Sequence, residues 1–60
     1  MIEDGIYAAT VSDMLFYRVE GDDIRVRVDN GEWVAPIIET TREIIEMFLD
    51  AGIVVKVSDL

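Results

Sequence analysis

Apolar and charged residues alternate strictly from Ile24 to Val28, and Asn30-Gly31 follows directly. Alternation of this kind is typical of a strand with one buried face, and Asn-Gly between β-rich runs is a strong hairpin signal. The pattern therefore predicts two antiparallel strands, over residues 23–29 and 32–38. Pro36 lies within the second run, which restricts that strand to a sheet edge or a strand end because proline cannot donate to a ladder.

Two further β-rich segments precede this hairpin, at residues 5–12 and 14–20, and are separated by the turn-forming pairs Ser12-Asp13 and Gly21-Asp22. If every connection is a two-residue turn, a single register places one set of side chains on a common inner face. A register slip of one residue would move a whole strand's set to the other face. The predicted pairs are Ile6 with Val19, Ala8 with Tyr17, Thr10 with Leu15, Leu15 with Val28, Tyr17 with Val26, Val19 with Ile24, Val26 with Ala35 and Val28 with Trp33.

The remaining chain predicts one helix and a short strand. Thr40 followed by Glu43 is a capping box and Gly52 suits the C′ position, so the helix is expected over residues 41–51. Its apolar residues recur at helical spacing, which indicates that one side packs on the inner face of the sheet. Residues 53–57 predict a fifth strand, which could pair with either the first or the fourth strand.

These elements predict an α+β fold in a single small domain, residues 1–60. It consists of a four-stranded antiparallel β-meander, one α-helix packed on one face and a short C-terminal fifth strand. A small SH3-like curled barrel with one helix is the alternative arrangement of the same segments.

Composition limits what such a domain can do. Sixty residues can bury only a small core, so a second chain that covers apolar surface would stabilise it. The absence of cysteine and histidine excludes disulfides, zinc-finger sites and Cys–His or Ser–His catalysis. No apolar run reaches the roughly 18 residues of a membrane span, and we expect a cytoplasmic protein. The net charge of −8 favours a basic protein partner over nucleic acid or a membrane surface.

The face of the sheet opposite the helix is the first candidate site. A protein partner or a second copy of the chain is expected to cover it, because aromatic residues, methionine and arginine are enriched at interfaces. Arginine beside exposed aromatic rings also suits the stacking of bases, so nucleic-acid binding by this face is the alternative. The predicted partner-binding residues are Tyr7, Met14, Phe16, Arg18, Arg25, Arg27 and Val34.

An acidic stripe along the predicted helix is the second candidate surface. Its residues are spaced by four, three and four positions and are Glu39, Glu43, Glu46 and Asp50. Such a stripe could imitate the phosphates of a nucleic acid and occupy the binding site of a protein that handles nucleic acids. The simpler interpretation is a solvated helix face in which Arg42 bridges to Glu46.

No motif indicates catalysis, a cofactor or a metal. The carboxylates at Glu3-Asp4, Asp22-Asp23 and Asp29 with Glu32 lack the fixed ligand pattern of a calcium loop. The sequence favours a small acidic, non-enzymatic interaction module that binds a protein partner and self-associates, acting as a phage or mobile-element inhibitor of a host nucleic-acid-handling protein. A nucleic-acid-binding domain and a structural subunit of a larger assembly are the alternatives.

Overall fold

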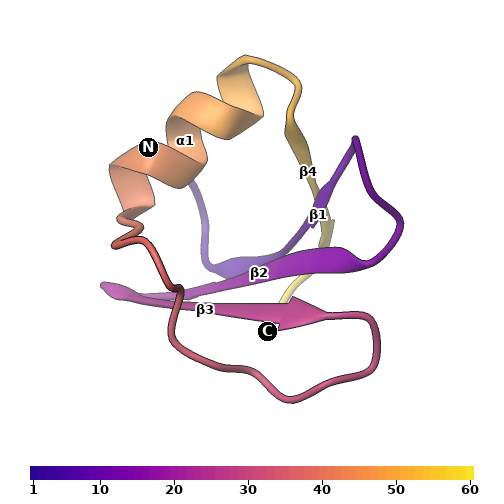
Figure 1. Ribbon diagram of the computed structural model, residues 1–60. Helices are drawn as coiled ribbons and strands as arrows, with labels where there is room; N and C mark the ends of the chain where they lie inside the picture. The colour runs from indigo at the N-terminus through magenta and orange to yellow at the C-terminus, as the bar shows by residue number, and fades with distance from the viewer.

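The computed structural model describes all 60 residues. Four antiparallel strands form one open sheet in the order β3-β2-β1-β4, and a single helix lies over one face (Figure 1). The elements are β1 (Gly5–Ala9), β2 (Leu15–Glu20), β3 (Asp23–Val28), α1 (Arg42–Asp50) and β4 (Val54–Ser58). The predicted α+β class, with one helix on one face of an antiparallel sheet, is confirmed.

The β2–β3 hairpin has the predicted register. Tyr17 pairs with Val26 and Val19 pairs with Ile24, so these four side chains share the face that α1 covers. Gly21 takes a φ of +59° in the connecting turn, a conformation that glycine adopts without steric cost. The alternation that was read from the sequence is therefore a reliable guide to this hairpin.

The predicted register of the first strand is wrong by one residue. Tyr7 pairs with Tyr17, whereas the sequence predicted Ala8 at that position. The connection from β1 to β2 spans residues 10–14 rather than a two-residue turn, and the extra length permits the shift. Because side chains alternate along a strand, Tyr7 and Ala9 face the core and Ile6 and Ala8 face outward.

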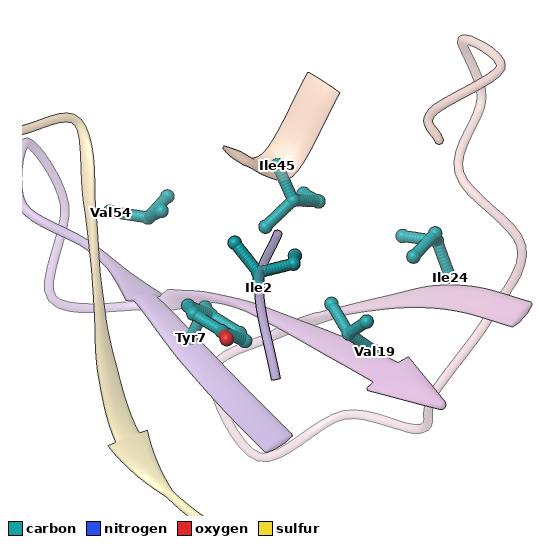
Figure 2. Close-up of a cluster of buried hydrophobic side chains, with 6 residues drawn as sticks. All are labelled: Ile2, Tyr7, Val19, Ile24, Ile45 and Val54. Carbon is teal, nitrogen blue, oxygen red and sulfur yellow. The ribbon is translucent and has the colours of Figure 1, made fainter. Parts of the chain in front are cut away.

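The reason for the shift is that the larger side chain is buried. Tyr7 is 1% exposed, and its hydroxyl donates a hydrogen bond of 2.6 Å to the backbone carbonyl of Glu3. Figure 2 shows its ring beneath Ile2, with Ile45 pointing down from the helix toward the same cluster. A buried tyrosine ring removes more apolar surface from water than isoleucine does, and its hydroxyl is satisfied here. The core consists of Ile2, Tyr7, Val19, Ile24, Ile45 and Val54.

The predicted strand over residues 32–38 is also wrong. Only Val34 returns to the sheet, where it exchanges two backbone hydrogen bonds with Val26, of 2.8 and 2.9 Å. Pro36 lacks the amide hydrogen that would continue the ladder. The sequence predicted Ala35 opposite Val26, so this segment too is displaced by one residue. Val34 consequently faces inward and Trp33 lies against Arg18 and Arg27 on the outer face.

The sheet therefore has four strands and no fifth, and the SH3-like barrel is not formed because the sheet is open. Of the two positions that the sequence left open for the C-terminal strand, β4 takes the one beside β1. The two strands approach closely at Gly5, where an added Cβ would lie 2.6 Å from the carbonyl oxygen of Ser58. Any other residue at Gly5 would force these strands apart.

The ends of α1 follow known capping chemistry with one displacement. The N-cap is Thr41 rather than the predicted Thr40: the Thr41 hydroxyl accepts a hydrogen bond from the amide of Ile44 at 3.3 Å. At the other end, the predicted role of Gly52 is confirmed by its φ of +76°. The amides of Gly52 and Ile53 donate to the carbonyls of Leu49 and Phe48, which is a Schellman motif.

Tyr7→Phe is expected to lower the free energy of unfolding by about 1 kcal/mol, because it leaves the Glu3 carbonyl without its hydrogen bond. Tyr17→Phe is the matched control, since the Tyr17 hydroxyl forms no hydrogen bond in the structure, and a change within about 0.5 kcal/mol is expected. Urea denaturation followed by circular dichroism measures both. Equal losses in the two variants would contradict the role given to the Tyr7 hydroxyl.

Candidate functional site

The helix covers only part of the sheet face on which it lies. Four strands about 4.8 Å apart form a sheet roughly 19 Å wide, whereas a helix has a diameter of about 10 Å. Ile45 is fully buried, and the ring of Phe48 lies 6.3 Å from that of Tyr17, between centroids. On this face, the ends of β2 and β3 that carry Leu15 and Val28 line an open groove instead of the core.

This uncovered region forms the floor of an apolar groove with a volume of about 350 Å³. The inward-facing side chains of β2 and β3 line one side, and the segment that leads from Val34 toward α1 lines the other. No charged residue lines the groove. The lining residues are Leu15, Tyr17, Val26, Val28, Val34, Ala35, Pro36, Ile37, Ile38 and Thr40.

The aliphatic residues of the groove are open to solvent. Ile37 is as exposed as in an extended chain (105%), Ile38 is 79% exposed, and Val28 and Val34 are 61% and 51% exposed. Single apolar residues at a surface are ordinary, but soluble monomers seldom expose a contiguous group that a partner does not cover. The groove is therefore the strongest indication of a binding surface in the molecule.

Two acidic residues adjoin the groove lining in the chain. Asp29 follows Val28, and Glu39 lies between Ile38 and Thr40 in the chain. Neither forms an ion pair in the structure. The basic side chains are occupied elsewhere: Arg42 pairs with Asp4, Lys56 pairs with Glu3 and Asp59, and the other three lie on the outer face.

The outer face carries a group of stacked arginines and aromatic rings. The guanidinium carbon of Arg27 lies 5.1 Å from the ring centroid of Phe16 and 4.8 Å from that of Trp33. Arg18 stacks on the same indole at 5.8 Å. These distances are within the range of cation–π interactions, so the arginines partly shield the rings from water.

The like charges that the register places opposite each other are bridged by one carboxylate. Arg18 and Arg25 pair across β2 and β3. Asp23 lies 3.1 Å from the Nε of Arg25 and 3.8 Å from the Nη2 of Arg18, which offsets their repulsion. Arg27 forms no ion pair, and its buried Nε has no hydrogen-bond partner.

The structure separates the seven predicted partner-binding residues. Phe16, Arg18, Arg25 and Arg27 share the outer face as expected. The outward placement of Tyr7 and Val34 is wrong, since Tyr7 is in the core and Val34 lines the groove. Met14 is exposed in the connection between β1 and β2, outside the sheet.

Sequence reasoning missed two features: the place of Trp33 on the outer face, and the groove itself. The signal for the groove was the run from Val34 to Ile38, five consecutive residues without a charge or a polar side chain. A half-buried strand alternates between apolar and polar residues, and this run does not. Apolar side chains of this run, such as Ile37 and Ile38, face solvent because no other part of this domain covers them.

The predicted acidic stripe is only partly free. Glu39, Glu43 and Asp50 are exposed, whereas Glu46 forms an ion pair with the amino group of Met1. The hydrogen bond from that amino group to Glu46 raises the pKa of the N-terminus. The expected bridge from Arg42 to Glu46 is wrong, because Arg42 reaches across to Asp4 instead.

Arg42 joins three segments at the start of α1. Its Nη1 donates to Oδ1 of Asp4 at 2.5 Å and to the carbonyl of Gly21 at 2.6 Å, and its Nη2 donates to the carbonyl of Ile2 at 2.6 Å. The hydrogen bond from Arg42, with a smaller contribution from the amide of Gly21, lowers the pKa of Asp4. The same contact raises the pKa of Arg42. This network fixes the end of the groove wall where it enters the helix.

A second ion-pair group holds the end of β4. Lys56 lies 2.8 Å from Asp59 and 3.1 Å from Glu3, and hydrogen bonds to these two carboxylates raise the pKa of Lys56 to about 12. The pKa of Asp59 is lowered by the same lysine. No group of three or more acidic side chains is arranged to hold a metal ion.

Comparisons of the chain with protein families, with curated proteins and with solved structures find no match. The one helix, nine residues long, has neither the length nor the apolar character that a membrane crossing needs. The evidence for function therefore comes from the groove and the outer face.

Acid is expected to weaken the anchoring of α1 through Asp4. Its pKa in the folded state lies below the ordinary value of about 3.9, so its contribution to stability is complete above that value and is lost as pH falls through the lowered folded pKa. Wild type should be more stable than Asp4→Asn near neutral pH, and the difference should shrink below about pH 4. Urea titrations of both proteins over this range measure it, and a difference that does not change with pH would contradict the assignment.

Proposed function

We propose that this chain is a non-enzymatic module that binds a segment of a protein partner in the apolar groove. The observation that supports the proposal is the groove's open wall, where Ile37 and Ile38 are almost fully exposed beside Val28 and Val34. Covering an aliphatic side chain of this size is worth about 1.5–3 kcal/mol. Three or four such contacts supply enough free energy for specific association.

The chemistry of the lining favours binding over catalysis. Of the ten lining residues, only Tyr17 has a titratable side chain. General acid–base or nucleophilic catalysis needs a positioned pair of such groups. Small-molecule sites also enclose most of their ligand, whereas one wall of this groove is open to solvent at Ile37 and Ile38. A segment of a larger protein suits an open groove better, because the rest of that protein can cover the exposed wall.

The groove is held in shape before any partner arrives. Its floor is the β2–β3 hairpin, with six residues in each strand. Its wall is fixed at one end by the two hydrogen bonds between Val26 and Val34, and at the other by the network around Arg42. Preorganisation of this kind lowers the entropic cost of binding.

A displayed library of random peptides, selected on the wild-type protein, tests the proposal. Peptides recovered in this way are expected to lose about 10- to 100-fold in affinity for Ile37→Gln, because one aliphatic contact is removed. Ile37 is fully exposed, so the variant should fold normally. Isothermal titration calorimetry measures the affinities, and amide chemical shifts should change at the residues that line the groove.

Met47→Gln is the control, because Met47 is an exposed apolar residue of α1 outside the groove. It should leave the affinity unchanged. Selected peptides that bind Ile37→Gln as well as wild type, with shift changes elsewhere on the molecule, would contradict the proposal.

A second candidate function is single-stranded nucleic-acid binding by the outer face. The observation that favours it is Arg27, which stacks against Phe16 and Trp33 and has no carboxylate partner. Arginine and aromatic side chains on a sheet are used to hold bases and phosphates. The overall charge of −8 opposes this function, which makes it the second candidate.

Fluorescence anisotropy with labelled single-stranded DNA and RNA, across a salt series, tests this second function. If it is present, Arg27→Gln should reduce the slope of log affinity against log salt by about 1, since one phosphate contact is lost. Met47→Gln should leave the slope unchanged. Absence of binding at low salt would remove this candidate.

A further inference from the structure

We propose that the segment bound in the groove is an amphipathic α-helix whose polar face is basic. The inference rests on the proposed function, because it names the partner of the same groove. It follows from two independent properties of the site, namely the size of the uncovered groove floor and the charge of the residues beside it.

The uncovered floor of the groove has the dimensions of a helix. It is two strands wide, because only β2 and β3 line it, and two strands span about 10 Å, the diameter of one helix. The floor is formed by Leu15 and Tyr17 of β2 and by Val26 and Val28 of β3, and it is about 10 Å long because Val19 and Ile24 are already buried in the core. Two turns of a helix have that length, since residues i and i+7 lie about 10 Å apart along its axis. Its apolar residues at positions i, i+3, i+4 and i+7 would meet Tyr17, Val28 and Ile37.

The acidic residues at the edge of the groove, Asp29 and Glu39, form its rim and determine the charge of the bound helix. Asp29 and Glu39 adjoin lining residues in the chain, and neither forms an ion pair in the structure. All five basic residues of the chain are stacked or ion-paired at other places. Lysine or arginine on the polar face of the partner helix would face these carboxylates, whereas acidic residues would be repelled.

The same argument disfavours a second copy of this chain as the occupant. Its one helix, α1, carries Glu43, Glu46 and Asp50 against a single arginine. The only large apolar side chain that α1 leaves highly exposed is Met47. A helix with this surface has neither the apolar stripe nor the charge that the groove requires.

Two synthetic peptides of 14 residues, long enough to present two helical turns to the groove floor, test the inference. They share one stripe of leucines at helical spacing, and their other positions are lysine and alanine in one peptide and glutamate and alanine in the other. The basic peptide is expected to bind at least about tenfold more tightly at low ionic strength, and the difference should narrow as salt is added. Calorimetry gives the affinities, and circular dichroism of the mixture should show added helix with the basic peptide.

Variants of the protein separate the role of the rim from the total charge. The double variant Asp29→Asn, Glu39→Gln should lower the affinity for the basic peptide by about threefold or more. The matched double variant Glu43→Gln, Asp50→Asn removes the same charge from exposed positions on α1, and should have a smaller effect. Equal effects of the two variants would show that the net charge of the protein, and not Asp29 and Glu39, attracts the basic peptide. That result would overturn the role given to the rim.

Other outcomes distinguish this inference from the function on which it depends. If both peptides bind equally, or the acidic one binds better, the basic partner is wrong while groove binding stands. If neither binds although library-selected peptides do, the helical partner is wrong. If wild type dimerises in sedimentation experiments and Ile37→Gln does not, the occupant is a second copy and the inference fails. If Ile37→Gln binds every peptide as wild type does, the proposed function itself fails.

Discussion

The burial of Tyr7 is the constraint on which the rest of the domain depends. Its ring lies in the centre of the core and its hydroxyl satisfies the carbonyl of Glu3, which also holds the N-terminal residues against the sheet. Tyr7 points inward because β1 pairs it with an inward-facing residue of β2, Tyr17. That register turns Ile6 and Ala8 outward and sets the composition of both faces of the sheet.

The second determinant is the ratio of helix to sheet. One helix of nine residues covers the end of the sheet where the core lies, so the other end of β2 and β3 faces only a segment without regular structure. Arg42 positions that segment, because it joins the start of α1 to the N-terminal residues and to the β2–β3 turn. The apolar groove is thus a consequence of a small domain that has more sheet than it can cover.

The apolar side chains on the two faces of the sheet differ in how far they are shielded from water. On the outer face the guanidinium groups of Arg18 and Arg27 lie over Trp33 and Phe16, so the rings are partly shielded by charged groups of the same chain. In the groove no such cover exists, and the aliphatic side chains of the wall remain in water. The contrast explains why the groove, and not the outer face emphasised by the sequence pattern, is the leading candidate site.

The sequence by itself determined the elements whose signals are local. The alternation around Val26, the Gly21 turn and the Gly52 cap specify the hairpin and the helix end through interactions only a few residues apart. Only the tertiary structure decided which way β1 and the segment at Val34 face, since a slip of one residue costs little locally and reverses every side chain. That choice depends on packing Tyr7 against Ile45, which is distant in the sequence, as well as against Ile2. The groove depends on the same choice, and so the local pattern could not reveal it.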